Sequence, residues 1–212
     1  MTPPILSIRN PQAMVRAAET VRAGGVIVIP TETIYGIAAL LENQAAIRRL
    51  YEVRERAPEP ATPLLLARAA LMGELARVNL VAQQLARRFW PGPLTLLLPP
   101  GPDLPLELRA APVALRVPGY APLLPLLDAV GGYLFVSGAI RAGHPPAITA
   151  QEAAALFGDD VALILDGGPV LFGVASTVVD CISVPPAVVR RGAISEDKLR
   201  DYLLPEAPAP AR

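Results

Sequence analysis

The chain has 212 residues, of which 52% are hydrophobic and 18% are charged, and its formal net charge is zero. This length can bury a full core without disulfides, and the composition excludes a disordered chain. Zero net charge argues against nucleic-acid binding by overall charge. The single Cys181 and single His144 exclude an internal disulfide and argue against a zinc cluster and against Ser-His or Cys-His catalysis.

The chain shows no sign of export or membrane insertion. Its first residues, "MTPPILSIRN", lack the basic and then apolar layout of a signal peptide. No uninterrupted apolar run approaches the roughly 20 residues that cross a bilayer. We therefore expect a cytoplasmic protein with no membrane partner.

Apolar periodicity, together with the positions of glycine and proline, predicts alternating helices and strands. In chain order, we expect a helix at 11–23, a strand at 26–29 that is buried on both faces, a helix at 44–56, a strand at 63–67, a helix at 79–90 with Asn79 as its N-cap, a turn and strand at 91–99, a strand at 113–118, a helix near 120–130, a strand at 133–138, a helix near 149–157, strands at 161–166, 176–182 and 187–192, and a helix near 195–203. Several late strands follow one another with no room for a helix. This favours an α/β fold with a mixed, twisted sheet in one domain over residues 1–204, followed by a flexible tail at 205–212.

Polar residues interrupt the chain at the ends of predicted strands, where open α/β sheets place ligands. The interruptions are Thr31 to Gly36, Arg54 to Arg56 with the loop to Thr62, Arg116, "SGAIRAGHPP" (137–146), and "DGG" (166–168) with Ser176, Thr177 and Arg190 to Gly192. Arginines, hydroxyls and glycine-rich turns suit a phosphate or carboxylate ligand. The sequence has neither GxxxxGK[ST] nor GxGxxG, so the P-loop and the dinucleotide fingerprint are absent.

Each of these residues also has a purely structural interpretation. Arg54 and Arg56 alone would usually be solvated charges at a helix end. Arg116 fits a ligand contact and a structural ion pair equally well, and Ser176 and Thr177 would usually be ordinary strand residues.

Several stretches occur together and in a fixed order: "GGVIVIPTETIYGIAAL", "LYEVRER", "FWPGPLTLLLP", "VALRVPG", "LDGG" before "GVASTVVD", and "VVRRGAI". From about residue 7 to 200 the chain thereby resembles the YrdC-like proteins, the threonylcarbamoyl-AMP synthases and their relatives. The resemblance implies an α/β fold around a concave, basic cavity. It also implies a nucleotidyltransferase that joins L-threonine, bicarbonate and ATP, with Mg²⁺, into threonylcarbamoyl-AMP and pyrophosphate. The product would serve other tRNA threonylcarbamoylation proteins, which modify adenosine 37.

The resemblance also implies roles for individual residues. Those that would hold L-threonine are Thr33, Tyr35, Arg56 and Arg116. Those that would face ATP are Arg54, Arg56, Thr62, Ser137, Ser176, Thr177 and Arg190. The proposed chemistry needs no catalytic His or Cys, because Arg54 and Arg56 would act by positioning and charge stabilisation. No residue is assigned as a ligand of Mg²⁺, since magnesium commonly sits on nucleotide phosphates and water.

The chain departs from the family pattern at two sites. Arg54-Glu55-Arg56-Ala57 replaces Lys-x-Arg-Pro. The Asn of a Ser-x-Asn motif falls on Ala139 if anchored on Ser137, or on Ile140 if anchored on the downstream Gly-His-Pro-Pro. The polar residues available to replace the lost amide are Ser137 and Arg141.

These departures leave two alternatives beside the synthase. One is a paralogue without catalysis that binds double-stranded or structured RNA, such as tRNA or ribosomal RNA, with an affinity that falls steeply with salt. The other is a carbamoyl-transfer enzyme like the hydrogenase maturation factor that contains a YrdC-like domain. That factor also carries zinc-finger-like and acylphosphatase segments, which this sequence lacks.

Overall fold

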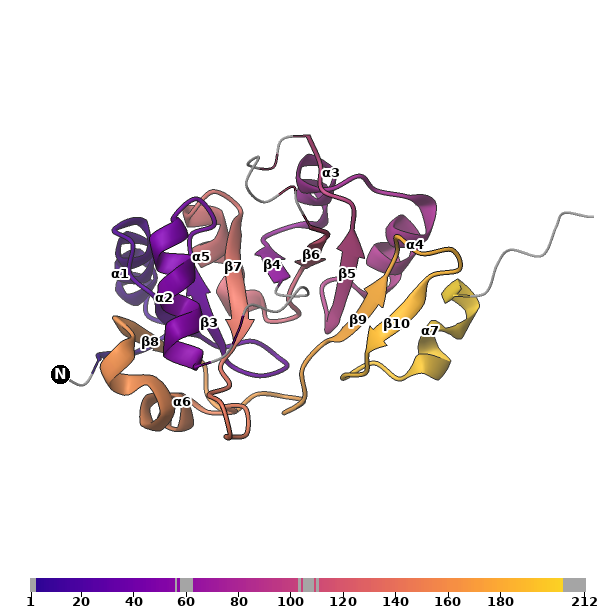
Figure 1. The fold of residues 1–212 in the computed structure, drawn as a ribbon. Helices are drawn as coiled ribbons and strands as arrows, with labels where there is room; N and C mark the ends of the chain where they lie inside the picture. Colours follow the sequence, from indigo (N-terminus) through magenta and orange to yellow (C-terminus); the bar gives the residue numbers. More distant parts are fainter. Residues whose placement is uncertain are drawn as a thin grey trace, which may run out of the picture.

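The computed structural model describes residues 3–55, 57, 63–102, 104, 109 and 111–203. Helices and strands are interspersed along the chain (Figure 1). The strands are β1 (Ile5–Ser7), β2 (Ile27–Ile29), β3 (Gly36–Ala39), β4 (Pro63–Leu66), β5 (Leu94–Leu98), β6 (Val113–Arg116), β7 (Tyr133–Gly138), β8 (Leu163–Asp166), β9 (Thr177–Asp180) and β10 (Ala187–Arg190). The helices are α1 (Pro11–Arg22), α2 (Gln44–Arg54), α3 (Met72–Leu75), α4 (Leu80–Phe89), α5 (Leu124–Ala129), α6 (Ala150–Phe157) and α7 (Glu196–Leu203). Several strands, such as β8, β9 and β10, follow one another with no α-helix between them.

The ten strands form one mixed sheet in the order β1-β8-β2-β3-β7-β4-β6-β5-β9-β10. The sheet contains both parallel pairs, such as β4 with β6, and antiparallel pairs, such as β3 with β7. We call β1, β8, β2, β3 and β7 the first half of the sheet, and β4, β6, β5, β9 and β10 the second half. The antiparallel pair of β7 and β4 joins the two halves, and this mixed sheet confirms the predicted fold class.

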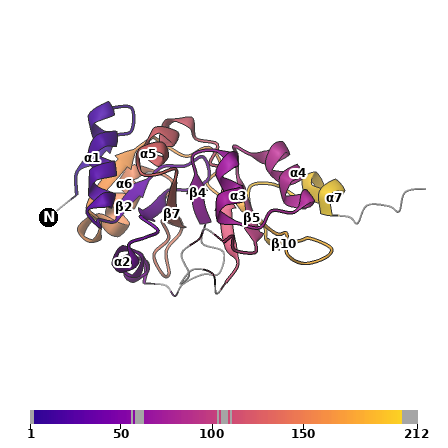
Figure 2. The ribbon, with the colours of Figure 1, turned by 90° about the horizontal axis from the view of Figure 1, so that it is seen from above.

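Helices cover both faces of the first half. Alternate residues of a strand point to opposite faces, so Ile27 and Ile29 of β2 pack in the core beneath α1 and α5, while Val28 packs in the core beneath α2 and α6. The view from above shows α1 and α2 on opposite sides of these strands (Figure 2). The prediction that this strand is buried on both faces is confirmed.

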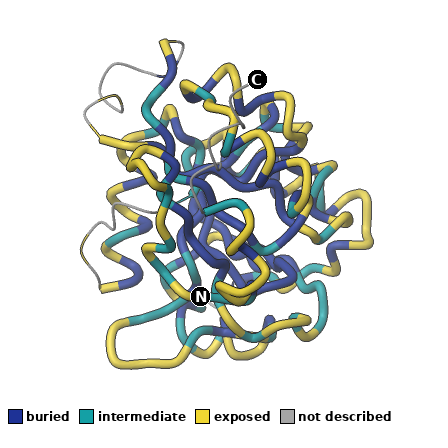
Figure 3. The backbone as a smooth tube through the Cα atoms, turned by 90° about the vertical axis from the view of Figure 1, so that its right-hand side faces the viewer, coloured by how far each residue is buried: buried dark blue, intermediate teal, exposed yellow. Residues whose placement is uncertain are grey.

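The second half buries one face under helices and turns part of the other toward a cavity. Leu64 and Leu66 of β4 and Leu115 of β6 belong to the core beneath α3, α4 and α7. By the same alternation, Leu65 and Arg116 point to the opposite side, where both line the cavity described below. The strands at the centre of the molecule are buried, and exposed residues gather in the outer loops and helices (Figure 3).

The described elements match most of the predicted ones within a few residues. Asn79 is the N-cap of α4, and its Oδ1 accepts a hydrogen bond from the Ala82 amide at 2.9 Å. Three elements were not predicted, namely β1, β3 and α3. The helix expected near 120–130 is shorter, because the segment with Pro122 and Pro125 begins as a 3₁₀ turn at Ala121–Leu123. The predicted tail at 205–212 lies outside the described residues. Among the helices of the described residues, none has the length and apolar character needed to cross a membrane.

Candidate functional site

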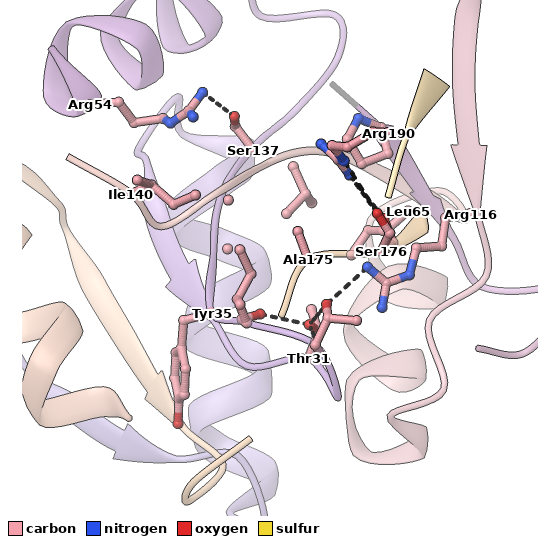
Figure 4. Close-up of a pocket in the computed structure, with 16 residues that line it drawn as sticks. Thr31, Tyr35, Arg54, Leu65, Arg116, Ser137, Ile140, Ala175, Ser176 and Arg190 are labelled. Atoms are coloured by element: carbon pink, nitrogen blue, oxygen red, sulfur yellow. Dashed lines mark hydrogen bonds between the residues drawn. The ribbon is translucent and has the colours of Figure 1, made fainter. Parts of the chain in front are cut away.

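Residues from both halves of the sheet line one hollow, which Figure 4 shows in close-up. It contains about 540 Å³ of empty space, including the open solvent at its mouth. Guanidinium groups, hydroxyls and apolar side chains share its lining. The described lining residues are Thr31, Thr33, Ile34, Tyr35, Gly36, Arg54, Pro63, Leu65, Arg116, Val136, Ser137, Gly138, Ile140, Ala175, Ser176 and Arg190. Such a lining can bind anionic groups through the arginines and enclose apolar groups beside them.

The loop between β2 and β3 forms one wall of the cavity. Thr31 Oγ1 donates a hydrogen bond to the Ile34 carbonyl at 2.6 Å and accepts one from the Thr33 amide at 3.1 Å. These local bonds replace the ladder bonds that Pro30 interrupts, and they fix a tight turn. The hydroxyls of Thr31 and Thr33 therefore lie side by side, 2.8 Å apart, and both residues line the cavity.

Arg116, the last residue of β6, spans the space behind this wall. Its Nη2 donates to Glu32 Oε1 at 2.7 Å, its Nη1 to Thr33 Oγ1 at 3.1 Å and its Nε to the Gly92 carbonyl at 3.1 Å. The Arg116 and Glu32 side chains are only 5% and 6% exposed. Burial lowers the pKa of Arg116, and the Glu32 carboxylate opposes that shift. The result is a buried ion pair, as one of the two sequence interpretations of Arg116 allowed, in a residue that also lines the cavity.

Arg54, the last residue of α2, lies across the cavity from Arg116 (Figure 4). It is buried, and its Nη1 donates to Ser137 Oγ on β7. The chain after β7 fixes the end of α2, because the Ala142 amide donates to the Arg54 carbonyl at 3.1 Å and Arg141 Nη2 donates to the Val53 carbonyl at 3.2 Å. Arg141 thus binds the C-terminus of α2 and does not line the cavity. It does not replace the amide of the family motif there.

Arg190, at the end of β10, forms a third side of the cavity. Its Nε and Nη2 donate to the Ser176 carbonyl at 3.2 and 3.1 Å, and Nη2 also donates to Ser176 Oγ at 3.1 Å. Ser176 Oγ lies 2.8 Å from Thr95 Oγ1 on β5. A Cβ at Gly192 would lie 2.3 Å from the Ala175 carbonyl oxygen, so only glycine lets the chain after β10 pass this close.

Tyr35 lines the cavity, but its hydroxyl points away from it (Figure 4). That hydroxyl donates to the Gly168 carbonyl at 2.8 Å and accepts from the Gly167 amide at 3.2 Å. Tyr120 donates to the Gly167 carbonyl at 3.1 Å. Burial raises the pKa of Tyr35 to about 12. Tyr35 therefore fixes the turn from which the chain returns to the cavity at Ser176.

The geometry matches a known family. The family model Sua5_yciO_yrdC, described as "Telomere recombination", matches residues 19–192. The chain belongs to the Sua5/YciO/YrdC family.

Two related proteins and one solved structure give the family assignment further detail. A Mycobacterium tuberculosis protein is 34% identical over 195 residues, which cover 91% of this chain and 89% of that protein. A Pyrococcus abyssi protein named threonylcarbamoyl-AMP synthase is 32% identical over 190 residues, which cover 88% of this chain and 56% of that protein. The crystal structure of P. abyssi Sua5 complexed with L-threonine superposes with a TM-score of 0.85 at 30% identity, covering 94% of this chain and 61% of that chain. This Sua5/YciO/YrdC chain therefore spans nine-tenths of the mycobacterial relative but little more than half of the archaeal one.

Most residues that the sequence predicts for the site converge in this Sua5/YciO/YrdC cavity. Those that line it are Thr33, Tyr35, Arg54, Arg116, Ser137, Ser176 and Arg190. Their assignment to L-threonine or to ATP stays a prediction. Arg56 and Thr62 lie outside the described residues.

Thr177 does not line the cavity. Its Oγ1 donates to the Ile194 carbonyl at 2.7 Å and accepts from the Ile194 amide at 2.9 Å, and the residue is fully buried. Successive residues of an extended chain point to opposite sides, so the side chains of Ser176 and Thr177 face in opposite directions. Of the two, Ser176 lines the cavity. The ATP role predicted for Thr177 finds no support in this geometry.

Sequence reasoning gave no role to Thr31, Glu32 or Ile140. Thr31 is two residues before Thr33, and that spacing alone could have placed it on the same wall. Ile140 lines the cavity whereas Ala139 is buried in the core, so of the two positions proposed for the lost amide, only Ile140 is at the cavity. Among the described residues no group of three or more His, Cys, Asp or Glu side chains could hold a metal ion.

Proposed function

We propose that this protein is a threonylcarbamoyl-AMP synthase, which condenses L-threonine, bicarbonate and ATP into threonylcarbamoyl-AMP and pyrophosphate. The observation that carries the proposal is the convergence of Arg54, Arg116 and Arg190 with threonine and serine hydroxyls on one cavity. The name of the P. abyssi relative and the L-threonine complex of P. abyssi Sua5 support it. The same names favour the synthase over the RNA-binding and carbamoyl-transfer alternatives.

The proposed reaction needs positioning and charge neutralisation more than a protein nucleophile. The threonine amine would attack bicarbonate, and loss of water would leave a carbamate. A carbamate oxygen would then attack the α-phosphorus of ATP, and pyrophosphate would leave. No histidine, cysteine or lysine occurs among the described lining residues, which fits such a reaction.

The side chains suggest a division of the cavity between the substrates. Arg54 with Ser137 and Arg190 with Ser176 would bind the ATP phosphates, since guanidinium groups form paired, charge-assisted bonds to phosphate. Arg116 and Thr33 would hold L-threonine on the opposite wall. Tyr35 would support that wall through the hydrogen bonds of its hydroxyl to the turn at residues 166–168 rather than by touching a substrate with that hydroxyl.

Magnesium would enter as MgATP. No carboxylate occurs among the described lining residues, and Mg²⁺ is commonly held by nucleotide phosphates and water. The product would pass to the other proteins that threonylcarbamoylate adenosine 37 of tRNA. We therefore place the protein in the cytoplasm, where ATP, L-threonine and tRNA occur together.

Pyrophosphate release tests the proposal. Purified protein incubated with MgATP, bicarbonate and labelled L-threonine should release pyrophosphate only when both threonine and bicarbonate are present, and the label should appear in an AMP conjugate. Folded protein whose pyrophosphate release does not depend on threonine would contradict the synthase. Binding of double-stranded RNA that weakens steeply with salt, in protein without synthase activity, would favour the RNA-binding paralogue instead.

A further inference from the structure

Glu32 is packed behind the cavity wall rather than within the cavity. It lies between Thr31 and Thr33, which line the cavity, but its own side chain pairs with Arg116. A Cβ at Gly119 would come within 3.2 Å of Glu32 Oε1, so the glycine leaves room for the carboxylate. Glu32 Oε2 is buried and has no hydrogen-bond partner within the described part of the chain. Glu32 therefore acts on the cavity through Arg116, not by touching a ligand.

The hydrogen bonds of this wall have a single direction. A carbonyl oxygen only accepts, so the 2.6 Å contact between Thr31 Oγ1 and the Ile34 carbonyl uses the one proton of Thr31. The 2.8 Å contact between the two hydroxyls must then use the proton of Thr33. Arg116 has no acceptor, so its Nη1 donates to Thr33 Oγ1. Donation thus runs from Arg116 to Thr33, from Thr33 to Thr31, and from Thr31 to the Ile34 carbonyl.

This direction decides what Thr33 can offer a ligand. Its proton and one of its two acceptor positions are already used, so the remaining position can only accept a hydrogen bond. The positive charge of Arg116 is balanced by Glu32 at 2.7 Å. A neutral pair with a free acceptor suits a hydrogen-bond donor better than an anion.

We propose that Glu32 is a positioning residue that, through Arg116, sets Thr33 Oγ1 as an acceptor for a donor group of the amino acid substrate. The shared chemistry is N–H or O–H donation, from the α-ammonium or from the β-hydroxyl of L-threonine. This inference rests on the proposed function and adds the recognition of one substrate to it. It makes this wall specific for the amino acid and leaves the phosphates of ATP to the other walls.

Glu32→Gln tests the proposal, because glutamine keeps an oxygen for Arg116 Nη2, removes the charge and exchanges the second oxygen, Oε2, for an amide NH₂ group. Binding of L-threonine is measured by calorimetry with Mg²⁺ and α,β-methylene ATP in bicarbonate-free buffer, below the melting temperature of each variant. Glu32→Gln should weaken L-threonine binding about tenfold, since a buried arginine without its counter-ion shifts from Thr33. Its affinity for the ATP analogue should change less than threefold. The control Asp128→Asn, which breaks the exposed pair of Asp128 and Arg68, should change neither affinity.

If Glu32→Gln does not fold, Thr33→Val tests the same proposal. It removes the acceptor at constant shape and should weaken L-threonine binding about tenfold, whereas Thr33→Ser should restore it. L-valine, which lacks the hydroxyl, distinguishes the donors. If the hydroxyl donates, Thr33→Val should erase the preference of the protein for L-threonine over L-valine. If the ammonium donates, Thr33→Val should weaken the binding of L-threonine and of L-valine by the same factor.

The outcomes separate this inference from the proposed function. Wild-type protein that does not bind L-threonine overturns the synthase and this inference with it. Wild-type protein that binds L-threonine, with affinity unchanged in Glu32→Gln and Thr33→Val, overturns the inference alone. The inference is also overturned if Glu32→Gln weakens binding of the ATP analogue as much as binding of L-threonine. A general disturbance of the cavity would explain that result.

Discussion

Arg190 connects the packing of the cavity with its charge. Its guanidinium group donates to both the carbonyl and the hydroxyl of Ser176, while the residue itself is only half-buried at the end of β10. A guanidinium group has five N–H donors, so it can both fix a neighbouring chain and take part in binding a phosphate. Loss of the contact with the neighbouring chain would lower stability, whereas loss of the phosphate contact would lower the affinity for ATP. A single variant in which both quantities are measured can therefore separate the two functions.

Arg190→Ala should weaken MgATP binding about tenfold and lower the free energy of unfolding by about 1 kcal/mol, the usual net value of a hydrogen-bonded group that is not fully buried. Calorimetry and urea denaturation of the same preparation measure the two quantities. Arg191→Ala is the matched control, because Arg191 is the next residue and its pair with Glu196 is exposed. A large loss of stability at unchanged ATP affinity would make Arg190 purely structural.

At the scale of elements, helix α2 brings Arg54 to the cavity, and the chain after β7 decides where that helix ends. The guanidinium group of Arg141 donates to the Val53 carbonyl, pairs with Asp160 and lies over the Phe157 ring, with 5.5 Å from its Cζ to the ring centroid. A cation at a helix C-terminus stabilises the helix through its unpaired carbonyl groups and its dipole. In the loop where the resemblance implies a Ser-x-Asn motif, Arg141 fixes the end of α2.

Arg141→Met should therefore lower the free energy of unfolding by about 1–2 kcal/mol and weaken MgATP binding, because the end of α2 loses its cap beside Arg54. Arg49→Met is the control. Arg49 also pairs with Asp160, at 2.9 Å, but it lies exposed on the side of α2 and should cost no more than about 0.5 kcal/mol. Equal losses in the two variants, with ATP binding intact in both, would show that Asp160 matters and the helix end does not. Denaturation curves and ATP titrations give both quantities.

The sequence predicted the elements that carry strong apolar patterns and missed the weak ones. Strand β2 is a continuous apolar run and was expected, whereas β3 reads "GIAA", in which Ile37 is the one residue with high strand propensity. Strand β3 forms because it pairs with β2 on one side and β7 on the other. Pairing of this kind depends on distant parts of the chain, which local propensity does not contain.

In the candidate site, too, the sequence predicted the residues that a local pattern marks and missed the contacts between distant parts of the chain. Polar residues at strand ends marked Thr33 and Arg116 in advance, because a buried strand that ends in polar groups needs partners for them. Arg54 was marked by its place at the end of a predicted helix, before the loop that leads to the next strand. The pair of Glu32 and Arg116 joins residues 84 apart in the chain, so no sequence pattern announces it. Thr177 was predicted by its place in a motif beside Ser176, and the alternation of strand residues could have separated the two.

At the scale of the whole molecule, the cavity takes its walls from both halves of one sheet. Thr33 and Arg54 are contributed from the first half, and Arg116 and Arg190 from the second. The antiparallel pair of β7 and β4 makes the sheet continuous across the cavity. A ligand in the cavity therefore contacts both halves of a single cooperative structure rather than two independent parts.

Ligand binding should accordingly stabilise the entire chain. With MgATP at about 100 times its dissociation constant, the free energy of unfolding should rise by about 2.7 kcal/mol, because the ligand binds only the folded state. For a chain of this size that corresponds to an increase in the melting temperature of about 5–10 °C, and L-threonine should add to it. Differential scanning calorimetry should show one transition that moves as a unit. At the same MgATP concentration, the melting temperature of Arg190→Ala should rise less than that of the wild-type protein, since the variant binds MgATP with a higher dissociation constant. Two transitions, with MgATP shifting only one of them, would mean that the halves unfold separately and that the cavity does not join them.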